Sequence, residues 1–126
     1  MTTTLTPDEK TTLSVLAFLF FRMGMDEKAL RVYEALSELS EAGSADRRFA
    51  KAGEAALLIE SGQGEAALAA LREALPVSAG AVSTKDAGLL LLKARALWLA
   101  DRKAEAEAVR DEYLHLAGGE DAGSAL

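Results

Sequence analysis

The residues of this chain that could do acid–base or metal chemistry are few and scattered. His115 is its one histidine, and cysteine is absent. His115 falls near the end of the last expected helix, where a Ser-His-Asp arrangement is hard to build, and with Asp111 or Glu112 it supplies too few metal ligands. Glu105 and Glu107 sit two positions apart on one helix and so point in different directions, which does not suit paired-carboxylate hydrolysis. The sequence therefore predicts no enzyme, no metal site and no cofactor.

Two other patterns could bind anions. Gly62-Gln63-Gly64 resembles a fragment of a phosphate loop, but no Lys-Ser or Lys-Thr pair follows it, so we expect a turn between helices there. Arg47, Arg48 and Lys51 could contact an anion, although a solvated helix start is the interpretation that we favour. Acidic residues outnumber basic ones by 20 to 14, which gives a net charge of −6. That field repels a phosphate backbone, so nucleic acid is not expected as a partner.

The elements that must position any site are predicted to be helices. Hydrophobic residues make up 50% of the 126-residue chain, and only 2 residues are proline. Ala, Leu, Glu and Arg dominate, and these residues lose least on entering a helix. Thr6-Pro7-Asp8-Glu9 predicts a capped helix start. We expect an all-α fold of about six helices, over residues 7–23, 26–40, 46–61, 65–75, 85–100 and 103–117, with a loop at 76–83 and a flexible acidic tail at 118–126.

The expected helices repeat as hairpins. When the turns at Gly24, Gly62 and Asp101 are aligned, an alanine stands seven residues before each turn and another stands five residues after it. A methyl group lets antiparallel helices approach closely near their turn, whereas a larger side chain would push the backbones apart. Three hairpins are therefore predicted in one domain of residues 1–117, with repeats at about 6–43, 44–83 and 84–117. The aligned alanines are Ala17, Ala55 and Ala94 before the turns, and Ala29, Ala67 and Ala106 after them.

This pattern resembles the tetratricopeptide repeat, most clearly at residues 23–30 with Tyr33 four residues after Ala29. The periods are 38 and 39 residues, longer than is usual in that family. Lys51 and Arg110 replace bulky residues that are usual in the family, so the second and third repeats depart from its pattern. The resemblance implies a short superhelix with a concave groove lined by the first helix of each hairpin.

The length and repeat layout also resemble the small tetratricopeptide chaperones of bacterial type III secretion, closest to the SctY (YscY-like) group. The lead-in Leu5-Thr6-Pro7-Asp8, the pair Ala29-Leu30 and the pair Ala35-Leu36 carry this similarity. It implies a cytoplasmic chaperone that holds a small secreted component, SctX, and delivers it to the export gate. The alternatives are a needle-subunit chaperone and a generic repeat scaffold or regulatory interaction module.

The implied groove would be rich in large apolar side chains. Counting from the first alanine of each hairpin, the hollow-facing positions include one basic residue and six large apolar ones. Leu13, Leu16, Ala17 and Phe20 are expected to fill the packed side of the first helix, so the core does not need the hollow-facing residues. A contiguous apolar patch of this kind usually marks a partner site. The predicted groove residues are Phe18, Phe21, Phe49, Ile59, Leu91, Arg95 and Trp98.

Two other uses of these side chains stay open. The loop at 76–83 or the tail could cover them, or they could form a homodimer interface; a self-dimer that hides Phe18 and Phe21 would fit a chaperone awaiting its client. The longest wholly apolar run, residues 15–21, spans about a third of a bilayer core. Membrane insertion is therefore not expected, and the lack of cysteine suits a reducing cytosol.

Overall fold

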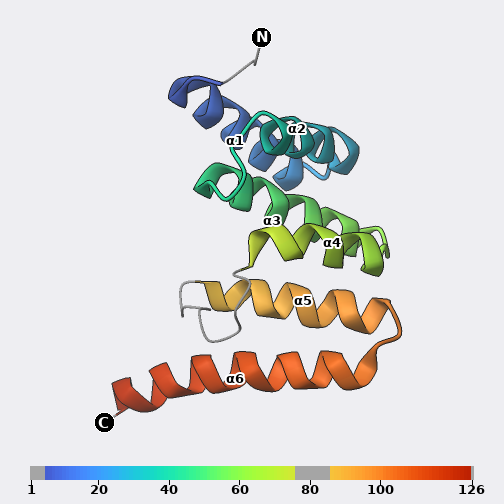
Figure 1. Ribbon diagram of the computed structural model, residues 1–126, viewed down its shortest axis with the longest axis vertical. Helices are drawn as coiled ribbons and strands as arrows, with labels where there is room; N and C mark the ends of the chain where they lie inside the picture. Colours follow the sequence, from blue (N-terminus) through green and yellow to red (C-terminus); the bar gives the residue numbers. More distant parts are fainter. Residues whose placement is uncertain (1–4, 76–85, 126) are drawn as a thin grey trace.

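The chain folds as a stack of three helical hairpins. The computed structural model describes residues 5–75 and 86–125, and side-chain surroundings as far as Gly118. These residues form six α-helices and no strand, which confirms the all-α prediction. The hairpins α1–α2, α3–α4 and α5–α6 follow one another along the long axis, so the two ends of the chain lie at opposite ends of the stack (Figure 1). The helices are α1 (Pro7–Arg22), α2 (Asp26–Glu38), α3 (Ala45–Glu60), α4 (Gly64–Ala74), α5 (Ala87–Leu99) and α6 (Lys103–Ala125).

Only the end of α6 differs by more than two residues from the boundaries that the sequence predicts. α6 continues to Ala125, so residues 118–125 of the expected flexible tail are helical. The glycines at 118–119 suggested an end because glycine weakens a helix, but the segment contains no proline, so every residue keeps the backbone N–H that continues the helical hydrogen bonds. The loop expected at 76–83 lies outside the described residues.

The start of α1 is the capping box that the sequence predicts. The Thr6 Oγ1 accepts a hydrogen bond from the Glu9 backbone N at 3.2 Å, and the Thr6 backbone N donates to Glu9 Oε1 at 2.9 Å. These two bonds satisfy backbone donors that the first helical turn would otherwise leave free. The pKa of Glu9 is lowered, chiefly because the Thr6 backbone N–H donates to its carboxylate and stabilises the charged form, with a smaller effect from the Thr6 side chain.

The three hairpin turns share one backbone conformation. Gly24, Gly62 and Asp101 have φ angles of 74°, 78° and 60°, all in the left-handed region. Glycine adopts this region without strain, and aspartate is among the residues that tolerate it best. The alignment of turns on which the repeat prediction rests is therefore a structural equivalence.

The aligned alanines lie where the helices of a hairpin meet. Four of them, Ala17, Ala29, Ala55 and Ala67, have no exposed surface, and Ala106 is 4% exposed. Ala94 is partly buried against the same core. The core falls into two clusters: one joins α1, α2 and α3, and the other runs from α3 to α6.

Gly64 marks a close approach that the repeat pattern does not reveal. A Cβ atom at Gly64 would lie 2.6 Å from the Ala96 carbonyl oxygen and 2.8 Å from the Ala100 backbone nitrogen. Both neighbours belong to the backbone of α5 or its end, so neither can move aside as a side chain could. The start of α4 therefore packs against α5 at a distance that only glycine permits, and this contact ties the second hairpin to the third.

We predict that Gly64→Ala destabilises the protein by about 1–3 kcal/mol, because the new methyl group forces α4 away from α5. Gly88→Ala is the matched control. Gly88 lies in the first turn of α5 with open space around its Cβ position, so alanine there should stabilise by up to about 1 kcal/mol. Urea denaturation of both variants measures the difference. Equal or opposite effects would show that α4 and α5 are not so closely packed.

Candidate protein-binding surface

The helix α1 presents three different faces. Ala17 is wholly buried, and Leu13 and Phe20 pack beside it against α2. A second face carries Phe18 and Phe21, and a third carries the remaining large apolar residues of the helix. Residues 11–21 contain no charge at all. A helix that is apolar on all sides needs more than one covering surface, and α2 covers only one face of α1.

The hollow-facing positions predicted from the sequence are mostly exposed. Phe18 and Phe21 on α1 are 51% and 37% exposed, and Phe49 on α3 is 45% exposed. On α5, Leu91 is 39% exposed and Trp98 is 53% exposed. We call these five side chains the first-helix apolar surface, because each lies on the first helix of its hairpin. Arg95, also predicted to line the groove, is exposed on α5 between Leu91 and Trp98.

Ile59 differs from the prediction for the groove. It is only 4% exposed and belongs to the core cluster that contains Ala96 and Leu97 of α5. Repeat counting places Ile59 at the same position as Phe21 and Trp98, but α3 is the middle first helix and packs directly against α5. The neighbouring hairpin therefore covers Ile59, and the residue is part of the core.

Leu16 is the converse case. The sequence places it with Leu13 and Phe20 on the packed side of α1, but it is 37% exposed. It turns toward the third face, where no element of the first hairpin lies over it. The apolar residues that the core does not absorb are therefore more numerous than the sequence predicts.

Several contacts hold the first-helix apolar surface in place. The ring of Phe49 meets the ring of Tyr33 edge to face, with centroids 5.8 Å apart. Lys103 Nζ lies 5.2 Å from the centroid of the Trp98 ring, a cation–π contact that orients the indole at the α5–α6 turn. Arg95 Nη2 lies 3.5 Å from Glu60 Oε1 and so joins α5 to α3 across the surface. Tyr33, the partner of Phe49 in this set of contacts, is buried, and its burial raises the pKa of its hydroxyl.

The basic cluster at the start of α3 is used inside the protein. Arg47 contacts Glu73 of α4 at 2.8 Å, and Lys51 contacts the same carboxylate at 3.4 Å. The bond from Arg47 is the largest cause that lowers the pKa of Glu73. Arg48 lies 3.2 Å from Asp86 and donates a hydrogen bond to a carbonyl at the end of α4. These pairs join α3 to the elements that follow it, so the cluster is a structural one.

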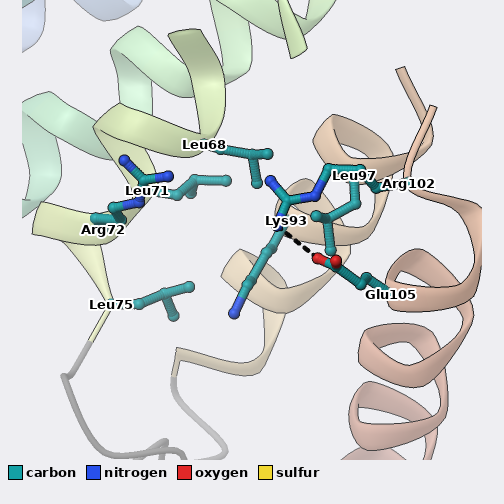
Figure 2. A pocket seen from close by; sticks show the side chains of 8 residues that line it. All are labelled: Leu68, Leu71, Arg72, Leu75, Lys93, Leu97, Arg102 and Glu105. Atoms are coloured by element: carbon teal, nitrogen blue, oxygen red, sulfur yellow. Dashed lines mark hydrogen bonds and ion pairs between the residues drawn. The ribbon is translucent and has the colours of Figure 1, made fainter. Parts of the chain in front are cut away.

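A cavity of about 440 Å³ lies between α4, α5 and the start of α6, where the sequence suggested no site (Figure 2). Leucines of α4 and α5 form one part of its lining, and charged side chains form the other. The Arg102 guanidinium there bonds to Glu105 at 2.6 Å. The lining contains no histidine and no hydroxyl nucleophile, so it suggests no reaction. Its residues are Leu68, Leu71, Arg72, Leu75, Lys93, Leu97, Arg102 and Glu105.

The candidates for acid–base and metal chemistry stay apart. His115 is exposed on α6. Among the described residues, no group of three or more His, Asp and Glu side chains is placed to hold a metal ion. In the same part of the chain, no helix combines the length and the apolar character needed to cross a membrane.

Comparisons of the sequence with protein-family models, of the chain with curated proteins and of its structure with solved structures return no match. The resemblance to tetratricopeptide chaperones thus rests on the residues quoted above.

Among the residues whose burial the structure describes, Glu54 is the one buried carboxylate. Its residue is 8% exposed, and Lys51 Nζ lies 3.4 Å from its Oε2. Burial raises the pKa of Glu54, and this effect outweighs the opposing attraction of Lys51. When the pKa of a carboxyl is higher in the folded than in the unfolded state, the protein loses stability as the pH rises above the pKa of the unfolded state.

We predict that Glu54→Gln gains stability relative to the parent protein as the pH rises from 4.5 to 7, because the amide removes a buried charge at neutral pH. Thermal unfolding across this range measures the difference. Glu38→Gln, at an exposed position of α2, is the control and should show no such trend. A Glu54→Gln difference that stays constant with pH would show that burial does not govern this carboxyl.

Proposed function

We propose that this protein is a non-catalytic adaptor that binds another polypeptide on its first-helix apolar surface. The observation that carries the proposal is the exposure, between 37% and 53%, of five large apolar side chains on α1, α3 and α5. Leaving such a side chain in water forgoes roughly 1.5–3 kcal/mol. Apolar groups that lie along one element after another of a repeat stack are the usual means by which such stacks bind extended or helical segments.

The surface suits an amphipathic helix or an extended segment. Trp98 and Phe21 would be its anchors, since aromatic side chains dominate the binding energy of protein interfaces. Small residues between them, Ala52 and Ala56 on α3, leave room for side chains of a guest. Arg95 is 58% exposed at its side chain and bonds to Glu60 over 3.5 Å. A carboxylate on the guest could compete for it.

The cellular role follows from the resemblance to the SctY group. On that basis the adaptor is a cytoplasmic chaperone of a type III secretion system, its guest is a small SctX-like component, and the export gate receives the guest. A generic repeat scaffold uses the same surface with another client, and a needle-subunit chaperone uses it with a different secreted subunit. All three versions share the surface and differ in the polypeptide that it binds.

Co-expression with candidate secretion subunits, followed by co-purification, tests the guest and the surface together. We predict that an SctX-like subunit co-purifies with the parent protein, and that Phe21→Glu and Trp98→Glu each weaken binding by about 2–4 kcal/mol, or about 30- to 1000-fold. Leu114→Glu is the matched control, because Leu114 is 54% exposed on α6, outside this surface.

The outcomes separate the guest from the surface. If a subunit binds and the two glutamate variants retain it while circular dichroism shows them folded, the surface assignment is wrong. If neither an SctX-like subunit nor a needle subunit binds, the secretion role is wrong and the scaffold version takes its place.

A further inference from the structure

The third face of α1 carries an apolar stripe that the proposed function does not use. Val15, Leu16, Leu19 and Met23 are 52%, 37%, 49% and 67% exposed. Three of them help to line a shallow hollow of about 360 Å³ together with Thr11 and Thr12. We call this stripe, with Thr12, the α1 end face, because it lies at the α1 end of the stack.

Repeat equivalence shows what such a face normally meets. Thirty-eight residues along the chain from Thr12, Val15, Leu16 and Leu19, the first helix of the second hairpin carries Ala50, Gly53, Glu54 and Leu57. Three of these are buried, and a Cβ at Gly53 would lie 2.5 Å from the Tyr33 ring of α2. On α5, the equivalent of Leu57 is Ala96. Ala96 is buried, and its carbonyl faces Gly64 of α4. On α3 and α5 this face is therefore covered by the preceding helix, whereas no helix precedes α1 in the described chain.

The opposite end of the stack is built differently. The positions on α2 and α4 that face the following helix include Tyr33 and Leu71. Their equivalent on the last helix is Arg110, whose side chain is 59% exposed. Glu107 and Asp111 are exposed beside it. A charged outer surface of this kind is typical of a repeat that ends a stack. It is a poor match for the apolar end face of α1, so a head-to-tail contact between copies is disfavoured.

A second copy of the α1 end face is the better match. Two chains that each carry a net charge of −6 repel one another on average. Residues 11–21 are uncharged, so two end faces can meet without placing like charges together. Val15 lies near the centre of this stretch and midway between two charged residues, with Asp8 seven residues before it and Arg22 seven residues after it.

Because Asp8 and Arg22 are equally far from Val15, two antiparallel α1 helices would place complementary charges opposite one another. Seven residues are close to two turns, so Asp8, Val15 and Arg22 lie near one line on the helix, with about 10 Å between neighbours. When two α1 helices pack antiparallel about a twofold axis at Val15, Asp8 of each copy lies opposite Arg22 of the other. A shallow crossing of about 20° keeps the two ends within reach. Asp8 and Arg22 are both exposed in the single chain.

We infer that the protein forms a twofold dimer by antiparallel packing of α1 on α1 through this end face. The contact is isologous, so it closes at two copies and does not propagate into fibres. One helix from each copy makes a small interface, below about 1,200 Å² in total, and the dimer should dissociate on the order of micromolar concentration. Phe21 and the residues of the first-helix apolar surface on α3 and α5 lie away from this stripe, so the inference does not depend on the proposed function.

Sedimentation velocity of the full chain from about 1 to 500 µM tests the inference. We expect a concentration-dependent monomer–dimer equilibrium. Val15→Glu should weaken it by at least about 30-fold, because two carboxylates would meet at the twofold axis. Phe21→Glu and Leu114→Glu are controls on other surfaces and should leave it unchanged. A monomer throughout the range, or a dimer that survives Val15→Glu, would overturn the inference.

Charge reversal tests the antiparallel arrangement itself. In Asp8→Lys a lysine faces Arg22 of the second copy, and in Arg22→Glu a glutamate faces Asp8, so each variant alone should dimerise about 10-fold more weakly at low salt. When the two variants are mixed, every opposed pair is again of opposite sign, and a heterodimer of parental affinity should form. Failure of the mixture to recover association would show that the helices do not pack in this way.

Discussion

The structure depends on how closely the backbones of neighbouring helices approach. Where the first two hairpins turn, the contact is made by alanines with no exposed surface, such as Ala17 and Ala29, and the third hairpin uses Ala94 and Ala106 in the same way with slightly more exposure. Between the second and third hairpins the contact is closer still, because Gly64 meets backbone atoms of α5. Once these contacts fix the rotation of each first helix, the face opposite the buried alanine stripe points out of the core, as Phe18 does one position after Ala17. The exposure of Phe18 is thus a consequence of where the small residues lie.

Much of this arrangement could be predicted from the sequence. The capping box at Thr6 and the three turns follow from local chemistry, because Pro, Gly and Asp have strong conformational preferences. The alanine spacing then placed five of the six aligned alanines in buried positions and named the first-helix positions that are exposed. These features depend on contacts within one hairpin, where the sequence separation is short and the periodicity is regular.

The errors arise where one hairpin meets another. Ile59 is equivalent to Phe21 by counting, but α5 covers it, and periodicity along α3 holds no information about the position of α5. Helical spacing places Leu16 with Leu13 and Phe20 on the packed side, although the first hairpin has no helix left to cover it. From the sequence Gly64 is only part of a turn, since a sequence does not show which backbone passes beside it.

The two ends of the stack place different demands on the same repeated fold. A repeat stack must end somewhere, and its last surfaces either carry polar residues or meet another molecule. Here the outer surface of α6 carries charged residues, because Arg110 stands where the earlier second helices carry Tyr33 and Leu71. The first helix instead exposes apolar residues of two kinds: Phe18 and Phe21 continue a surface shared with α3 and α5, whereas Val15 and Leu19 lie where a preceding helix would pack. Phe18, three residues after Val15, lies beside the contact in an α1 pair through Val15, whereas Phe21 lies on another side of α1 and stays open to a client in each copy. The uncharged run of residues 11–21 therefore exposes more apolar surface than the proposed client surface alone would use.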